Sequence, residues 1–214
     1  MGVPVMVYGQ SGSGKSTSLR GFRSDEVCVV NVSGKPLPFK TDLKTYHCDD
    51  YMKIDTAIRS APANAIIIDD ATYLMTNEFM RGAKTTGYQK FTDMALNFWT
   101  LIQTAIRLPP DKIIYFMGHV DLDANGNEKF KTIGKLLDEK VTLEGLFTIV
   151  LKTVVTDGKY SFSTQTNGMD TVKSPMGMFP EQLIDNDLKA VDTAIREYWG
   201  LAPLNAREDK NESI

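Results

Sequence analysis

The feature that most constrains the fold is a glycine-rich turn between a short apolar run and a more polar segment. Residues 3–8, VPVMVY, are typical of a buried strand, and GQSGSGKS follows at 9–16. This stretch matches G-x-x-x-x-G-K-[ST] at every fixed position. Glycines permit a tight loop whose backbone N–H groups point at phosphate oxygens, and a following helix of about two turns adds its positive end. The sequence therefore predicts a phosphate-binding loop.

The same pattern predicts roles within the loop. Lys15 is expected to reach the β- and γ-phosphates of a nucleoside triphosphate, and the Ser16 hydroxyl is expected to bind Mg²⁺. Strand, turn and helix come in the order that such a loop requires. The residues expected to contact the nucleotide are Gly9, Gln10, Ser11, Gly12, Ser13, Gly14, Lys15, Ser16 and Thr17.

A pair of carboxylates ends another apolar run, AIIIDD at 65–70. A site of this kind needs an acid at the tip of a neighbouring strand to hold the magnesium shell, and we assign Asp69 that role. Asp70 is placed to orient an attacking water, although a solvated helix cap is an equally good interpretation. We therefore expect Ser16 and Asp69 to share the metal and Asp70 to act in catalysis.

His119 ends the run KIIYFMGH at 112–119. Open α/β sheets bind ligands at the carboxyl ends of their strands, so an imidazole there is placed to sense the γ-phosphate or position water. A purely structural histidine is the alternative. Lys15, Asp70 and His119 are the predicted catalytic residues.

Strands and helices alternate along the first part of the chain, which predicts a mostly parallel sheet covered on both faces. A late hairpin, turning at Asp157-Gly158-Lys159, predicts antiparallel strands at one edge. Residues 71–90 show no clear period. The further expected strands are 27–32, 45–48, 146–155 and 160–166, and the expected helices are 49–60, 92–107 and one from 184 to 198. We expect one α/β domain over 1–203 and a polar, disordered tail over 204–214.

Composition limits the partners. The 24 basic and 27 acidic residues give a net charge of −3, which does not indicate a nucleic-acid binder by itself. No uncharged apolar run approaches about 18 residues, and the first residues lack a leader pattern, so no membrane partner and a cytoplasmic location are expected.

One segment nevertheless suits nucleic acid. No acidic residue lies between Phe79 and Thr92, a segment in which aromatic side chains are interleaved with basic ones. Phosphate attraction with base stacking would suit single-stranded DNA, and an ordinary solvated loop is the equally weighted alternative. The candidate DNA-contacting residues are Arg81, Lys84, Tyr88 and Lys90.

A later lysine suggests assembly. Lys173 follows the last strand in TNGMDTVKSP at 166–175. In oligomeric ATPases a basic residue of a neighbouring subunit often completes the γ-phosphate site, and Lys173 is a candidate for that role. A surface lysine is the alternative.

Together these segments resemble a known group. VMVYGQSGSGKST, VVNVSGKPLPF, IIIDDATYL, IIYFMGH and TNGMDTVKSP are similar to small phage-encoded P-loop proteins near the RecA-like, single-domain ATPases of the Sak type, which are implicated in single-strand annealing and recombination. The resemblance implies a RecA-like core, ATP with Mg²⁺, and ring or filament assembly in the host cytoplasm. It also implies single-stranded DNA or a single-strand-binding protein as partner.

The chain departs from that pattern at one point, because the strand VCVVNVSG is not followed by the usual catalytic Glu. Hydrolysis then falls to Asp70, Asp49 or Asp50, or is slow, and an ATP-switched assembly protein becomes an alternative. A P-loop kinase is a second alternative, although the scattered arginines do not form the lid that such kinases carry. A GTP switch is excluded because no N-K-x-D motif is present.

Overall fold

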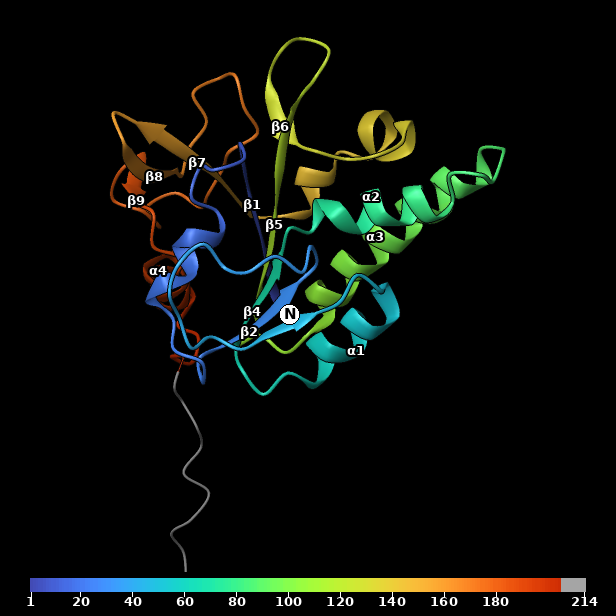
Figure 1. The fold of residues 1–214 in the computed structure, drawn as a ribbon. Coiled ribbons are helices and arrows are strands. Elements are labelled where there is room, and N and C mark those ends of the chain that lie inside the picture. The colour runs from blue at the N-terminus through green and yellow to red at the C-terminus, as the bar shows by residue number, and fades with distance from the viewer. Residues whose placement is uncertain (205–214) are drawn as a thin grey trace, which may run out of the picture.

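The computed structural model describes residues 1–204, and one nine-stranded sheet runs through them (Figure 1). The strand order is β3-β2-β4-β5-β1-β7-β8-β9, with β6 pairing beyond this path with β5. The strands are β1 (Val3–Gly9), β2 (Val27–Asn31), β3 (Thr45–His47), β4 (Ala65–Asp69), β5 (Ile113–Leu122), β6 (Glu128–Phe130), β7 (Ile149–Thr156), β8 (Lys159–Ser163) and β9 (Leu183–Asp185). The helices are α1 (Tyr51–Ser60), α2 (Thr72–Arg81), α3 (Gln89–Arg107) and α4 (Leu188–Trp199), with short helical turns η1 (Ser16–Gly21), η2 (Leu136–Lys140) and η3 (Leu143–Leu146).

The pairing confirms a mostly parallel α/β sheet with an antiparallel extension at one edge. All pairs from β3 to β7 along the strand order are parallel, whereas β8 and β9 are antiparallel. The turn between β7 and β8 is the predicted one, because Asp157 and Gly158 both have positive φ, at 52° and 76°. Two consecutive left-handed residues match the twist of a tight hairpin.

Alternating side chains of β1 divide the core into two layers. Val5 and Val7 pack with η1 and α4 on one face, whereas Met6 and Tyr8 pack with α1, α2 and α3 on the other. Figure 1 shows α4 on one side of the sheet and α1–α3 on the opposite side. Burial on both faces explains why the parallel strands are continuous apolar runs rather than alternating ones. No helix within residues 1–204 is long and apolar enough to cross a bilayer.

The segment after the glycine-rich turn is a helix of the predicted length. Its 6 residues, Ser16–Gly21, form a 3₁₀ helix, which at about three residues per turn makes two turns. Three consecutive hydroxyl residues begin it, and the Ser18 hydroxyl donates to the Lys15 carbonyl at 2.6 Å. Hydroxyl groups that bond nearby backbone disfavour a long α-helix.

Other boundaries differ from the prediction. Helix α2 occupies 72–81, where the sequence shows no period, and its Glu78 accepts a 2.8 Å hydrogen bond from Asn97 of α3. The last helix begins at Leu188, because Asp187 caps it, and Ile184 belongs to β9. Residues 146–148 precede β7, which begins at Ile149. Apart from Leu204, the predicted tail lies outside the described residues.

Candidate functional site

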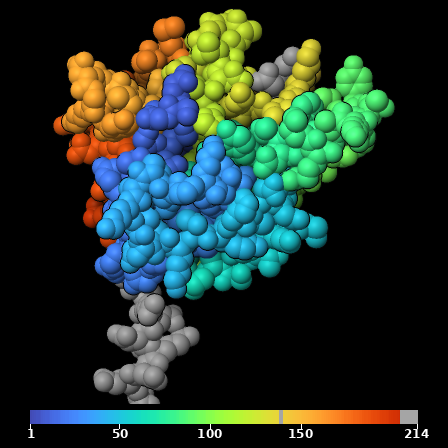
Figure 2. Space-filling view, viewed as in Figure 1, coloured from blue at the N-terminus to red at the C-terminus, as the bar shows by residue number. Residues whose placement is uncertain are grey.

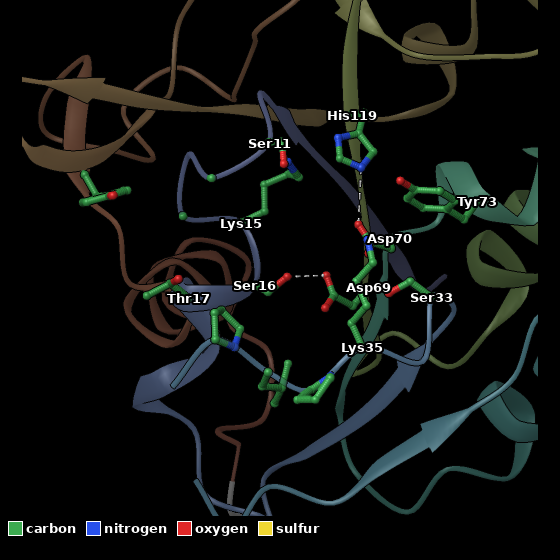
Figure 3. Close-up of a pocket in the computed structure, with 16 residues that line it drawn as sticks. Ser11, Lys15, Ser16, Thr17, Ser33, Lys35, Asp69, Asp70, Tyr73 and His119 are labelled. Atoms are coloured by element: carbon green, nitrogen blue, oxygen red, sulfur yellow. Dashed lines mark hydrogen bonds and ion pairs between the residues drawn. The ribbon is translucent and has the colours of Figure 1, made fainter. Parts of the chain in front are cut away.

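The predicted site residues meet at one edge of the sheet. Parallel pairing places Gly9 of β1 beside His119 of β5, and Asn31 of β2 beside Asp69 of β4. The carboxyl ends of β1, β2 and β4 therefore lie at one edge, and His119 lies beside the end of β1, although β5 continues to Leu122 and His119 is not its last residue. Figure 3 shows Ser16, Asp69, Asp70 and His119 around one cavity.

That cavity has a volume of about 450 Å³, within the range of small-molecule sites. It opens between the glycine-rich loop, the ends of β4 and β5, and the loop after β2. The lining residues are Ser11, Gly12, Gly14, Lys15, Ser16, Thr17, Ser33, Lys35, Pro36, Leu37, Pro38, Asp69, Asp70, Tyr73, His119 and Tyr160. Gly9, Gln10 and Ser13, which were predicted to contact the nucleotide, shape the loop without lining the cavity.

The glycine-rich loop is held by β7 and by its own backbone angles. Gly12 and Gly14 have φ of +76° and +94°, which favour glycine. The Ser13 and Thr153 hydroxyl oxygens lie 2.5 Å apart. A β-carbon at Gly9 would lie 1.9 Å from the Thr153 oxygen, whereas one at Gly12 would meet nothing within 4 Å. The loop is thus tightly seated at its base and open at its tip.

Lys15 folds back along the loop. Its Nζ donates to the carbonyls of Gly9 at 2.9 Å and Gln10 at 2.8 Å. An ammonium has three N–H groups, so one remains for a ligand. Burial lowers the pKa of Lys15, and the charges of Asp70 and Asp69 partly oppose that shift. A fixed, desolvated cation at this place favours a polyanion in the cavity.

Ser16 and Asp69 are joined directly. The Ser16 hydroxyl donates to Asp69 Oδ1 at 3.0 Å, and Asp69 is only 5% exposed. Burial, followed by the charge of Asp70, raises the pKa of Asp69 to about 6, although the Ser16 hydrogen bond lowers it. Asp69 is therefore ionised at neutral pH and offers a hard oxygen beside a hydroxyl oxygen.

This donor set fits magnesium. Among the side chains that the structure describes, no group of three or more His, Cys, Asp or Glu residues could hold a metal by itself. Mg²⁺ is usually held by one or two carboxylates together with substrate phosphates and water, so Ser16 and Asp69 are sufficient from the protein.

Asp70 and His119 form a second pair of neighbouring side chains in the site. Asp70 has φ of +60°, which aspartate tolerates better than most residues, and its Oδ1 lies 3.6 Å from His119 Nε2. That nitrogen is buried and has no hydrogen-bond partner. Burial and the Lys15 charge lower the pKa of His119, which favours the neutral imidazole, and the charge of Asp70 opposes that shift. An unpaired buried nitrogen is costly without a ligand or water to bond it.

The structure places Asp49 and Asp50, the two alternative carboxylates for hydrolysis, outside the cavity. Asp49 accepts hydrogen bonds from Arg81 at 2.6 Å and Asn77 at 2.9 Å, and Asp50 caps α1 by accepting from the Lys53 amide. Neither lines the cavity, which leaves Asp70 as the carboxylate beside Asp69.

The basic and aromatic residues of the candidate DNA segment lie away from the cavity, around the connection between α2 and α3. Figure 2 shows this green region projecting from the body of the molecule. Lys84 and Tyr88 are exposed, whereas Arg81 binds Asp49 and Lys90 lies 5.3 Å from the ring centroids of both Phe79 and Phe91.

Lys173 also lies outside the cavity. Its backbone exchanges hydrogen bonds with Val150 at 2.8 and 3.0 Å, and its side chain is partly exposed. It does not line the cavity of its own chain.

Sequence reasoning missed seven of the residues that line the cavity: Ser33, Lys35, Pro36, Leu37, Pro38, Tyr73 and Tyr160. Lys35 had a usable signal, since it follows a buried parallel strand whose end lies at the ligand-binding edge. Tyr160 had none, because it reaches the loop only through the antiparallel hairpin. Its ring comes within 2.8 Å of a β-carbon built at Gly14.

No protein-family model matches the chain, and no curated protein is detectably similar to it. What the cavity can do therefore follows from its own chemistry. A glycine-rich loop that is open at Gly12, a buried lysine and a serine–aspartate pair together suit a phosphorylated ligand with a bound divalent cation.

Proposed function

We propose that the chain is a P-loop ATPase with a RecA-like core that binds ATP with Mg²⁺ in this cavity. The observation that carries the proposal is the 3.0 Å hydrogen bond between the Ser16 hydroxyl and Asp69, beside a glycine-rich loop. Ser16 and Asp69 would hold Mg²⁺, which would neutralise phosphate charge when bound. Lys15 would contact the phosphate chain through its remaining N–H group.

The reaction proposed is hydrolysis of the terminal phosphate. Asp70 and His119 face each other at 3.6 Å at the end of the cavity formed by β4 and β5. In our proposal the Asp70 carboxylate accepts a hydrogen bond from the attacking water, and His119 contacts the terminal phosphate or that water through Nε2. No arginine lines the cavity, which counts against a kinase with a basic lid.

The proposed setting is phage DNA recombination, with the protein acting as a homo-oligomer on single-stranded DNA or with a single-strand-binding protein. The projecting, exposed Lys84 and Tyr88 support the DNA contact, since charge and an aromatic face are what single strands bind. Lys173, which is outside its own cavity, would act on a neighbouring subunit.

A second function has one specific observation in its favour. The loop after β2 brings Lys35 rather than a carboxylate to the cavity, so a single acid, Asp70, is left to activate water. A cavity with a single carboxylate to activate water is what we expect of an ATP-switched assembly protein with slow hydrolysis.

One paired experiment tests these functions. ATP turnover is measured with and without single-stranded DNA, and the mass in solution is measured with and without ATP. Lys15→Ala should abolish nucleotide binding while leaving the fold intact, because the side chain contacts only loop carbonyls. DNA-stimulated turnover supports the ATPase, and ATP-dependent assembly with little turnover supports the switch. Wild-type affinity for ATP in Lys15→Ala would contradict both.

A further inference from the structure

The loop after β2, residues 33–38, lines the cavity across from the glycine-rich loop (Figure 3). Buried Asn31 fixes it, because its Nδ2 donates to the Lys35 carbonyl at 2.6 Å and its Oδ1 accepts from the Gly34 amide at 2.8 Å. Gly34 has φ of +69°, and a β-carbon there would lie 2.8 Å from the His47 ring. The path of this loop is therefore specified by side chains outside the cavity.

Lys35 is the cationic residue with which this loop lines the cavity. Its Nζ lies 5.1 Å from the centroid of the Tyr73 ring, and that ring packs edge-on against His119 with centroids 5.5 Å apart. A lysine over an aromatic face is held in place by the negative charge of that face. Lys35 forms no ion pair with any residue whose side chain the structure describes. Its charge is thus available to a ligand on the side of the cavity that carries His119.

We propose that Lys35 binds the outermost phosphate of a nucleoside triphosphate, so that the site distinguishes a triphosphate from a diphosphate within a single chain. This inference rests on the proposed function. In this proposal the glycine-rich loop and Lys15 hold the phosphate chain from one side, and Lys15, which is expected to reach the β- and γ-phosphates, already uses two N–H groups on Gly9 and Gln10. Lys35 approaches from the loop after β2, over the Tyr73 ring that contacts His119. It supplies in the same chain the cation that Lys173 was expected to bring from a neighbour.

The test compares the affinities for ATP and ADP, each with Mg²⁺, in the wild type, Lys35→Ala and Lys35→Arg. A charged hydrogen bond lost from one phosphate should weaken ATP binding about tenfold and change ADP binding less than about twofold. Lys35→Arg should restore most of the ATP affinity. Lys44→Ala is the matched control, since Lys44 is exposed and lies outside the cavity.

The outcomes separate this inference from the proposed function. Selective loss of ATP affinity in Lys35→Ala supports it. Equal losses for ATP and ADP, or no loss for either, would overturn it while leaving a nucleotide site in place. A wild-type protein that binds neither nucleotide would overturn the proposed function and this inference together. Lys15→Ala should weaken both nucleotides, which distinguishes an inner-phosphate contact from an outer one.

Discussion

The Ser16 hydroxyl lies 3.0 Å from the Asp69 carboxylate, although the two residues are 53 positions apart in the chain. Each comes from the end of a different parallel strand, β1 through its loop and β4 directly. The pair is buried enough to raise the pKa of Asp69 to about 6, and yet it opens on the cavity. Folding thus places two oxygen ligands together and makes one of them sensitive to pH near neutrality.

The first prediction concerns that pH dependence. Mg²⁺ needs the ionised Asp69, so below about pH 6 each unit of pH should weaken Mg²⁺-dependent ATP binding about tenfold, and above that pH the affinity should level off. Nucleotide affinity measured with and without Mg²⁺ across this range checks it. Asp69→Asn should show little Mg²⁺ dependence at any pH. A wild-type Mg²⁺ effect that is flat through pH 6 would remove Asp69 from the metal site.

The second prediction concerns His119. Its unpaired Nε2 faces Asp70, so His119→Gln should lower kcat for ATP hydrolysis about 100-fold and leave the ATP dissociation constant within about threefold. Steady-state turnover together with equilibrium binding checks this. Tyr73→Leu is a useful companion, because it removes the ring beside the imidazole without touching Nε2. Unchanged kcat with a raised KM in His119→Gln would indicate a binding role only.

The sequence was informative wherever local pattern and parallel pairing decide position. Buried apolar runs predicted β1, β4 and β5, and the rule that parallel strand ends share an edge was enough to bring Ser16, Asp69 and His119 together. That prediction did not require the pairing registers of the three strands. The glycine-rich motif also predicted the loop. Gly12 and Gly14 have positive φ, a backbone conformation that favours glycine.

The rest depends on contacts between distant segments. Lys35 reaches the cavity because Asn31 and His47 set the path of its loop, and neither contact leaves a periodic signal. Arg81 looked available for DNA, but it binds Asp49, which lies 32 residues earlier. Helix α2 was missed because its buried residues, Thr72, Leu74 and Met75, gather near its start and leave no regular apolar stripe along 72–81.

The third prediction tests how the glycine-rich loop is seated. Gly9→Ala places a methyl group 1.9 Å from the Thr153 hydroxyl, so it should lower the free energy of unfolding by about 1–3 kcal/mol and weaken nucleotide binding. Gly12→Ala meets no atom and should cost only the strain of a positive φ, about 1 kcal/mol. Denaturant unfolding checks both. Adding Thr153→Ala should relieve part of the Gly9→Ala loss, and full additivity of the two changes would contradict the proposed clash.

The fourth prediction assigns the DNA contact to the exposed part of the α2–α3 connection. Arg81 and Lys90 already have partners within the chain, so Lys84 and Tyr88 should carry most of the contact. Lys84→Ala should reduce the slope of log affinity against log salt by about 0.7, the value for one phosphate on a single strand. Tyr88→Ala should weaken binding by about 1–3 kcal/mol with little change in slope, because stacking involves no counterions.

Fluorescence anisotropy with a labelled single-stranded oligonucleotide at several salt concentrations measures both effects. Lys53→Ala on α1 is the control for charge, since Lys53 is equally a surface lysine but lies outside this connection. Arg81→Ala should change DNA binding less than Lys84→Ala does, because its guanidinium is bound to Asp49. If Lys53→Ala lowers the slope as much as Lys84→Ala, the attraction is a property of the whole surface and the α2–α3 connection is not the binding site.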